Sequence, residues 1–198
     1  MNPTAIIILA AGESARFGQV KQLQLFNGKT LLQHAMDEAM NANANPVIVV
    51  TGAHAEEIQK SIGKKNTEII FNPDWRGGMG SGIVTSVRHI MQTHPDVSNI
   101  ILAVCDQPFI SSSLFNQLAE TRLKSKKNMV ASAYADTLGT PVLFTKKYFD
   151  ALLGLRGDEG AKKIVKANSN DVATVPFPEG DIDIDTQKDY EALLNHEL

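Results

Sequence analysis

One short loop of the sequence combines glycines with two cationic side chains. Residues 9–21 read Leu-Ala-Ala-Gly-Glu-Ser-Ala-Arg-Phe-Gly-Gln-Val-Lys. The small residues let the backbone approach a ligand closely and direct its N–H groups inward, and Arg16 and Lys21 add two positive charges. A polyphosphate suits this chemistry. The alternative is a glycine-containing turn with two solvated cations.

The spacing within this loop differs from that of two common phosphate-binding motifs. Gly12 and Gly18 enclose five residues instead of four, and no Gly-Lys-Ser/Thr ending follows. The chain also lacks a G-x-G-x-x-G segment. A P-loop kinase and a dinucleotide-dependent dehydrogenase are therefore both disfavoured.

Acidic side chains stand at two places that could hold a cation. Asp106 directly follows the apolar run Ile100–Val104 and Cys105, a position poorly suited to a casual surface charge. Mg²⁺ prefers oxygen ligands and often joins carboxylates to phosphates, so Asp106 could hold it against a polyphosphate. Further on, Asp181, Asp183 and Asp185 alternate along a segment that would place them on one face. The alternative for Asp106 is a helix N-cap or a turn-forming aspartate, and for Asp185 or Thr186 it is the cap of the following helix.

A glycine-rich segment, residues 72–82, could lie against a flat ligand. Gly80 and Ser81 could offer main-chain groups to a base, and a helix beginning at Ser81 would favour negative charge nearby. A floppy surface loop is the alternative, although Trp75 could anchor the segment. The single cysteine, Cys105, has no neighbouring base in the sequence and is interpreted as a small buried residue.

The elements that must position these residues alternate along the chain. Four apolar, largely β-branched runs predict buried strands at Ile6–Leu9, Val47–Val50, Ile69–Phe71 and Ile100–Val104. Helices are predicted after a Thr30 cap and at Ala55–Ile62, Ser81–Met91 and Ser112–Leu123. This alternation predicts an α/β fold, a three-layer, doubly wound and mostly parallel sheet. Ligands of such sheets bind beyond the carboxyl ends of the strands, which points to loops 10–22, 51–55, 72–82 and 105–110.

The second half of the chain is less regular. Strands are predicted at Met129–Ala133, Pro141–Phe144 and Val172–Val175, and a helix at Gly160–Lys166. No linker, repeat or low-complexity tract divides the chain. Residues 1–198 are therefore expected to form a single domain.

Composition excludes several classes of protein. With 43% hydrophobic and 21% charged residues the chain is neither disordered nor a coiled-coil rod. A net charge of -3 supplies no general positive field, so neither nucleic acid nor an anionic membrane is an expected partner.

The longest apolar stretch, Ala5–Ala11, is too short to span a bilayer, and one cysteine cannot form an internal disulfide, so a cytoplasmic location is expected. The five histidines, at 34, 54, 89, 94 and 196, lack the i, i+4 spacing of a helical metal site, and no histidine-based metal is expected.

Four segments together carry a family resemblance. These are Leu-Ala-Ala-Gly-x-Ser-x-Arg-x-Gly-x-x-Lys at 9–21, Gly-Met-Gly-Ser at 78–81, Cys-Asp-Gln-Pro at 105–108 and Asp-Ile-Asp-Thr at 183–186. The chain resembles the MobA-like nucleotidyltransferases over essentially its whole length, and most closely the molybdenum cofactor cytidylyltransferases. The resemblance implies a Rossmann-like nucleotidyltransferase fold.

The resemblance also implies roles for individual residues. Arg16, Lys21 and Asp106 would be catalytic, and Asp106 and Asp185 would hold Mg²⁺ as the cofactor. The residues expected to bind the nucleotide are Leu9, Ala10, Ala11, Gly12, Ser14, Arg16, Lys21, Thr51, Gly80, Ser81 and Asp106. Leu-Ala-Ala-Gly is typical of members that use CTP, whereas Leu-Ala-Gly-Gly is typical of members that use GTP, so Ala11 favours CTP.

For the second substrate, the resemblance points to the pterin-binding segments of the family. The acceptor-binding residues would be Gly139, Thr140, Pro141, Asp158 and Gly160. Thr140 replaces a histidine often found in the family's Gly-x-Pro-Val segment, so the acceptor is less well defined than the nucleotide. Expected partners are CTP and molybdopterin or molybdenum cofactor, with transient contact to a molybdoenzyme or its chaperone.

The expected reaction is transfer of CMP from CTP to the terminal phosphate of molybdopterin, with release of pyrophosphate. A phosphate monoester has a second pKa of about 6 and is largely ionised at neutral pH, so the transfer needs no dedicated base. Alternatives are GTP as the donor, a sugar phosphate as the acceptor, or a non-catalytic protein that binds nucleotide and delivers cofactor.

Overall fold

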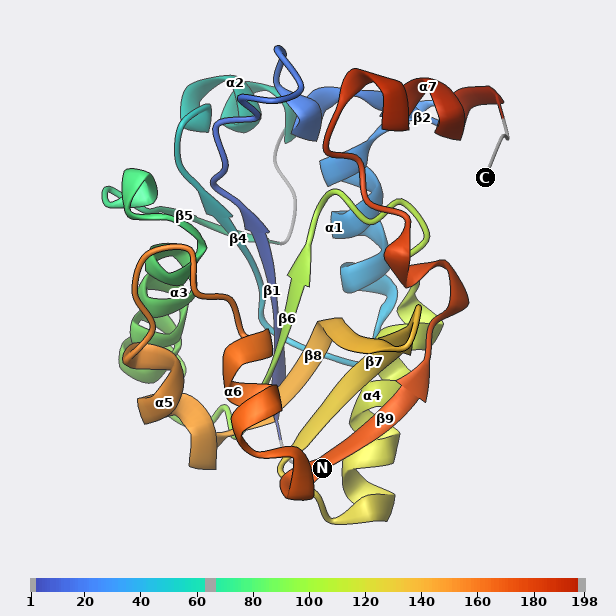
Figure 1. The fold of residues 1–198 in the computed structure, drawn as a ribbon. Helices are drawn as coiled ribbons and strands as arrows, with labels where there is room; N and C mark the ends of the chain where they lie inside the picture. The colour runs from blue at the N-terminus through green and yellow to red at the C-terminus, as the bar shows by residue number, and fades with distance from the viewer. Residues whose placement is uncertain (1–2, 63–66, 196–198) are drawn as a thin grey trace.

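A computed structural model describes residues 3–62 and 67–195. Its main feature is a seven-stranded sheet in the order β5-β4-β1-β6-β8-β7-β9, flanked by helices (Figure 1). The strands are β1 (Thr4–Ala10), β4 (Val47–Thr51), β5 (Glu68–Phe71), β6 (Asn99–Val104), β7 (Met129–Tyr134), β8 (Thr137–Thr145) and β9 (Val172–Pro176). The helices are α1 (Leu31–Asn41), α2 (Ala55–Ile62), α3 (Met79–Thr93), α4 (Ser112–Ser125), α5 (Phe149–Leu153), α6 (Lys162–Ala167) and α7 (Gln187–Asn195). A short hairpin, β2 (Leu25–Phe26) and β3 (Lys29–Thr30), lies outside the sheet.

The predicted three-layer α/β architecture is confirmed. Strand β1 lies between β4 and β6 and is parallel to both, with Ile7 opposite Ile48 and Leu102. Side chains of β1 alternate between the two faces of the sheet: Ile6 and Ile8 pack in one core cluster and Ile7 in the other. A strand covered on both faces is apolar throughout, which accounts for the unbroken run predicted from the sequence.

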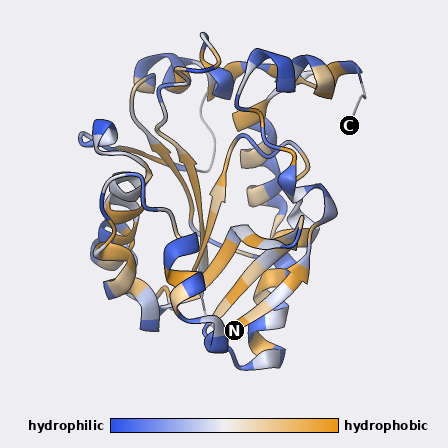
Figure 2. Ribbon diagram, viewed as in Figure 1, coloured by the Kyte–Doolittle hydropathy of each residue, from blue (hydrophilic) through white to orange (hydrophobic). Residues whose placement is uncertain are grey.

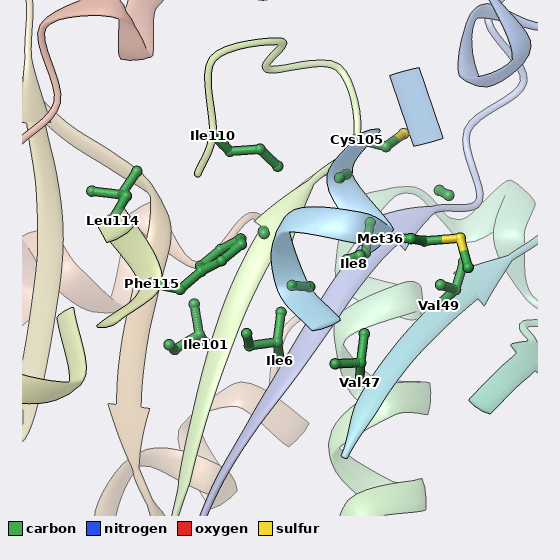
Figure 3. Packing of buried hydrophobic residues seen from close by; sticks show 14 of the residues in the cluster. Ile6, Ile8, Met36, Val47, Val49, Ile101, Cys105, Ile110, Leu114 and Phe115 are labelled. Carbon is green, nitrogen blue, oxygen red and sulfur yellow. The ribbon is translucent and has the colours of Figure 1, made fainter. Parts of the chain in front are cut away.

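A different set of helices covers each face of the sheet (Figure 1). One core cluster contains side chains of α1, α2 and α4, and the other contains side chains of α3, α5 and α6. Figure 3 shows the first cluster, where Met36 of α1 lies beside Ile8 and Val49, and Phe115 of α4 lies near Ile101. The hydropathy colouring follows the same layers, with apolar strands between helices whose outer faces are polar (Figure 2).

The sheet is mostly parallel, as predicted, with one strand reversed. Strand β8 pairs antiparallel with both β6 and β7, while β9 is parallel to β7. The register between β7 and β8 shifts between Ala131 and Ser132, so the pairing skips Thr140 and Pro141 on β8.

Helix starts follow local capping chemistry. The Thr30 side chain accepts a hydrogen bond from the backbone N–H of Gln33 and begins α1, as predicted. Ser111 caps α4 in the same way. Helix α3 begins at Met79, two residues before the predicted start at Ser81, because Gly78 adopts φ +81° and turns the chain into the helix.

A third, smaller cluster joins the first loop to the end of the chain. Phe17 packs with Leu31, Ile184 and Leu193. The ring of Phe17 also meets that of Tyr190 in α7 edge to face, with centroids 5.9 Å apart. Arg16 and Asp185, the sequence neighbours of Phe17 and Ile184, are thereby brought to the same edge of the sheet.

Within residues 3–62 and 67–195, no helix combines the length and apolar character needed to cross a bilayer.

Candidate active site

Four charged side chains converge beyond the carboxyl ends of β1 and β6. The Lys21 Nζ lies 2.6 Å from Oδ2 of Asp106 and 3.0 Å from Oδ1 of Asp185. A guanidinium nitrogen of Arg16 lies 2.8 Å from Oδ2 of the same Asp185. The lysine and Asp106 are largely shielded from solvent, whereas the Arg16 side chain is 72% exposed. Residues from three distant parts of the sequence therefore form one connected network of charges.

The first loop is shaped from within by Gln22. Its side-chain amide donates to the carbonyl oxygens of Gly12 at 2.9 Å and Ala10 at 3.3 Å, and its Oε1 accepts from the Ser14 hydroxyl at 3.1 Å. The side chain is 1% exposed. Ser14 itself adopts φ +57° and accepts a hydrogen bond from the backbone N–H of Lys21. Sequence reasoning missed Gln22, because a single glutamine beside a lysine carries no local signal for this role.

Asp185 is held in position by its backbone. The N–H of Ile184 donates to the carbonyl oxygen of Asp106 at 2.9 Å, so the two acidic segments are tied directly together. Helix α7 is capped by Thr186, whose hydroxyl accepts from the N–H of Asp189, while the Asp189 carboxylate accepts from the N–H of Thr186. The capping alternative thus applies to Thr186, and the Asp185 carboxylate faces the cations instead.

The network shifts the pKa values of its members. Burial opposes the charge on Lys21, but the carboxylates of Asp106 and Asp185 outweigh it and raise the pKa of Lys21 above its usual range. Partial burial acts to raise the pKa of Asp185, yet hydrogen bonds from Lys21 and Arg16 leave that pKa lowered. Partial burial and the negative charges of Asp185 and Asp106 raise the pKa of Asp183, a third carboxylate at this edge.

The burial of Cys105 agrees with its interpretation as a core residue. It is buried in the cluster shown in Figure 3. Burial, together with the neighbouring negative charge of Asp106, raises the pKa of Cys105 to about 12. The thiol is therefore not poised for nucleophilic attack.

The glycine-rich segment is ordered by a buried asparagine. The Asn72 amide donates to the Ser81 hydroxyl at 2.8 Å, and its oxygen accepts from the N–H of Asp74 and the Thr85 hydroxyl. Asn72 is fully buried. Fixed at both ends in this way, the segment is not a floppy loop, and Asn72 is a second residue that sequence reasoning missed.

Main-chain groups at the start of α3 are already partly used. The N–H of Gly80 donates to the carbonyl oxygen of Gly157 at 3.0 Å, and the Ser81 hydroxyl donates to the carbonyl oxygen of Gly78. Gly80 is also buried, and a Cβ added there would meet the backbone of Arg156 and Gly157 at 3.1 Å. A ligand could therefore contact Gly80 only if the segment 156–157 moved.

The other residues expected at the nucleotide lie along the same sheet edge. Leu9 and Ala10 are the last residues of β1, with Ala10 buried. Ala11 lies against Gly52, where an added Cβ would come within 2.9 Å of the Ala11 Cβ. The Thr51 hydroxyl donates to the carbonyl oxygen of Ile70 and is 2% exposed, so it braces β4 against β5. Gly12 faces open space.

The residues expected at the acceptor fall into two groups. Asp158 lies against Gly78, and Gly160 lies beside Met79, so both stand at the start of α3. Gly139, Thr140 and Pro141 instead belong to β8. A Cβ at Gly139 would overlap the Tyr134 hydroxyl, which explains why glycine occupies this position.

Sequence comparison identifies the family. The MobA-like NTP transferase domain model matches residues 6–172. The chain belongs to this family. The family consists of nucleotidyltransferases. The matched residues include Arg16, Lys21 and Asp106, and the match ends before Asp185.

Individual relatives extend the match over nearly the whole chain. The purine catabolism protein PucB of Bacillus subtilis is 25% identical over 198 aligned residues, covering 94% of each chain. The nicotine blue oxidoreductase of Paenarthrobacter nicotinovorans is 26% identical and covers 81% of this chain and 80% of its own. The crystal structure of Rv0371c from Mycobacterium tuberculosis has a TM-score of 0.83 at 26% identity, with 98% of both chains covered. A second structure of that protein is a complex with manganese, at a TM-score of 0.81 and 24% identity.

Proposed function

We propose that this protein transfers CMP from CTP to the terminal phosphate of molybdopterin and releases pyrophosphate. The observation that carries this proposal is the meeting of Lys21, Asp106 and Asp185 beside the glycine-containing loop. Such a site pairs a cationic group for a triphosphate with carboxylates for a metal, which is the charge arrangement that nucleotidyl transfer requires. The family assignment supports the same class of reaction.

The carboxylates fit a hard divalent cation. Asp106 and Asp185 direct one oxygen each at a single positive group, the Lys21 ammonium, 2.6 and 3.0 Å away. Oxygen ligands from two carboxylates suit Mg²⁺. Asp183 adds a third carboxylate at this edge, and its pKa is raised by partial burial and then by the negative charges of Asp185 and Asp106. We propose that Asp106 and Asp185 hold Mg²⁺. When bound, the metal would neutralise charge on the α-phosphate region of CTP.

The cationic side chains would serve the leaving group. In the structure, Arg16 pairs with Asp185 and Lys21 pairs with Asp106. When a triphosphate and a metal bind, the two cations would pair with phosphate oxygens instead, and the two carboxylates would bind the metal. Arg16 is suited to this exchange because most of its side chain is exposed. In the proposed step a molybdopterin phosphate oxygen forms a bond to the α-phosphorus of CTP. The bond from that phosphorus to the bridging oxygen breaks, and its electron pair leaves on pyrophosphate, where Arg16 and Lys21 stabilise the added charge.

Selection of CTP would depend on Ala11. The Cβ atoms of Ala11 and Trp75 both lie near Gly52, at 2.9 and 2.7 Å from where a Cβ would stand on that glycine. A methyl group there would narrow the space for the base. The larger purine of GTP would be hindered more than the smaller pyrimidine of CTP. The Leu-Ala-Ala-Gly pattern typical of CTP-using relatives supports this choice.

Pyrophosphate release distinguishes this proposal from its alternatives. We expect release with CTP only when molybdopterin is also present, and weaker release with GTP. Activity with a sugar phosphate in place of molybdopterin would refute the acceptor. Tight CTP binding without pyrophosphate under any condition would favour a cofactor-delivery protein, and Asp106→Asn would then leave delivery unchanged.

A further inference from the structure

A second group of metal-binding side chains lies at the opposite end of the sheet. Glu68 is the first residue of β5, and His89 and His94 belong to the end of α3 and its C-cap. Because β5 is parallel to β1 and β4, its first residue lies at the edge away from Lys21 and Asp106. With a rise of 1.5 Å per residue, the 15-residue α3 separates His94 from the glycine-rich segment by about 20 Å.

The three side chains point their ligand atoms at one another. The His89 Nε2 lies 2.9 Å from Oε2 of Glu68, and the His94 Nε2 lies 2.7 Å from Oε1. One ligand atom from each residue falls within 4.8 Å of the others. The two imidazole rings stand edge to face with centroids 6.2 Å apart. This arrangement differs from a surface ion pair, since two separate imidazoles share one carboxylate.

The end of α3 brings the two histidines together. Positions five apart on a continuous α-helix would point about 140° away from each other. Here the helix ends at Thr93, and His94 adopts φ -131° and ψ 61° while its N–H still bonds to the carbonyl oxygen of Ile90. The side chain of His94 therefore returns to the face of His89. A search for i, i+4 histidines cannot find this pair, which is why the sequence indicated no histidine-based metal.

The side chains are also accessible to an ion. The Glu68 side chain is 41% exposed and those of the two histidines 27% and 29%, so a cation could enter while water fills the remaining positions. Burial acts to raise the pKa of Glu68, but the hydrogen bonds and charges of His89 and His94 leave it lowered.

We propose that Glu68, His89 and His94 form a transition-metal site, best suited to Zn²⁺, that fastens β5 to the C-terminal end of α3. Two imidazole nitrogens with one carboxylate oxygen match Zn²⁺, whereas Mg²⁺ prefers oxygen alone. Ligand atoms around tetrahedral Zn²⁺ stand about 3.3 Å apart. The two nitrogen–oxygen distances of 2.9 and 2.7 Å would widen slightly to reach this value, and all three ligand atoms already lie within 4.8 Å of one another. Water would supply the fourth ligand. The site is independent of the proposed transfer reaction.

Metal titration tests this site directly. Tag-free protein is stripped with a chelator and titrated with Zn²⁺ or Co²⁺ in millimolar Mg²⁺, which occupies sites built of carboxylates alone. We expect one equivalent to bind, the melting temperature to rise, and Co²⁺ to give the visible absorption of a low-coordinate imidazole site. Glu68→Gln and His94→Asn should each weaken binding by more than about 100-fold, since even outer-shell changes cost 10- to 100-fold.

Two control variants separate this site from other metal ligands. His54→Asn removes a histidine that lies 3.2 Å from Glu57 but belongs to no described three-residue cluster, and it should leave binding unchanged. Asp106→Asn should also leave it unchanged. Circular dichroism would establish that Glu68→Gln, the most conservative change, is folded. Zn²⁺ affinity that is the same in wild type, Glu68→Gln and His94→Asn would overturn the proposal, as would wild-type protein that binds no Zn²⁺.

Discussion

The Nζ of Lys21 lies 2.6 Å from Oδ2 of Asp106, although 85 positions separate these residues in the sequence. The same ammonium reaches Asp185, so one cation stands between two carboxylates, one from the loop after β6 and one from the segment just before α7. A lysine in this position neutralises the acids while no metal is bound. Nucleotide and metal binding would then require the lysine to leave the carboxylates for a phosphate. The proposed transfer therefore begins with an exchange of charged partners among Lys21, Asp106 and Asp185.

Lys21→Ala should slow pyrophosphate release by about 100- to 1000-fold, the usual effect of losing one preorganised group that stabilises developing charge. Folding should change little, because Lys21 begins a three-residue 3-10 helix outside the sheet and Mg²⁺ can neutralise the carboxylates. Initial rates and melting temperatures measured with Mg²⁺ check both statements. Lys29→Ala is the matched control, since Lys29 pairs with a single carboxylate, Asp37, on the surface. Wild-type rates in Lys21→Ala would reject its role.

Asp106→Asn and Asp185→Asn should each raise the Mg²⁺ concentration needed for half-maximal activity and lower the rate at saturation. The main-chain bond between Ile184 and Asp106 does not involve the altered atoms, so the fold should persist. Asp181→Asn changes an exposed carboxylate in the same segment and should behave as wild type. An unchanged Mg²⁺ dependence in both active-site variants would show that these carboxylates do not hold the metal.

Much of the fold was predictable because burial leaves a local signature. Each residue of the Ile6–Leu9 run contacts one core cluster or the other, so the run had to be apolar on both faces. Strand direction leaves no such signature. The apolar residues of β8, Val142 to Phe144, resemble those of a parallel strand, yet β8 runs antiparallel to β6. Direction depends on the connecting segments and the bulge near Thr140, which hydrophobic periodicity does not encode.

The candidate site was predictable only in part. Charged residues after strands stand out in the sequence, so Lys21 and Asp106 were found. Gln22 and Asn72 were not, because their importance lies in hydrogen bonds to distant main-chain groups. The hydrogen bond from the Gly80 N–H to the Gly157 carbonyl oxygen joins residues 77 positions apart, so no local sequence pattern predicts it.

Ala11→Gly should relax the choice between CTP and GTP. Removing one methyl group opens space beside Gly52, and a difference of this size changes discrimination by about tenfold or more. The kcat/KM values for both nucleotides, measured with the same acceptor, give the ratio directly. A ratio identical to that of wild type would remove Ala11 from specificity.

Gly12→Ala should weaken CTP binding without changing the melting temperature, whereas Gly52→Ala should lower the melting temperature. An added Cβ at Gly12 meets nothing within 4 Å, so the melting temperature should stay the same while the methyl group occupies space expected for the triphosphate and weakens CTP binding. At Gly52 the Cβ would approach the Ala11 carbonyl oxygen at 2.6 Å and the Trp75 Cβ at 2.7 Å. That variant should melt at a lower temperature, because one of the two loops must shift. Calorimetry and CTP titration distinguish the two outcomes, and stronger CTP binding to Gly12→Ala would contradict the assigned position of the triphosphate.

Asp171 gives a pH-dependent prediction away from the active site. Its carboxylate accepts hydrogen bonds from Lys147 at 2.8 Å, from the Asn128 backbone at 3.0 Å and from the Tyr148 hydroxyl at 2.9 Å. These bonds join the segment before β9 to the residue before β7 and to the turn after β8. The Lys147 bond is the main cause of the lowered pKa of Asp171; burial opposes it, and the Asn128 bonds add to it. The folded protein therefore binds fewer protons here than the unfolded chain, whose aspartate has a pKa of about 3.9. The resulting stability is complete above that value and is lost as pH falls through the lower folded pKa.

Asp171→Asn should accordingly lower the free energy of unfolding by about 2 kcal/mol at pH 7, the usual contribution of hydrogen bonds to a charged group. The difference from wild type should shrink as pH falls below about 3.9, because the wild-type carboxyl also becomes neutral. Urea unfolding at a series of pH values measures this difference. Asp150→Asn, which changes an exposed carboxylate on α5, should match wild type at every pH. A destabilisation by Asp171→Asn that stays constant down to pH 2 would mean that shape, and not charge, makes this contact stabilising.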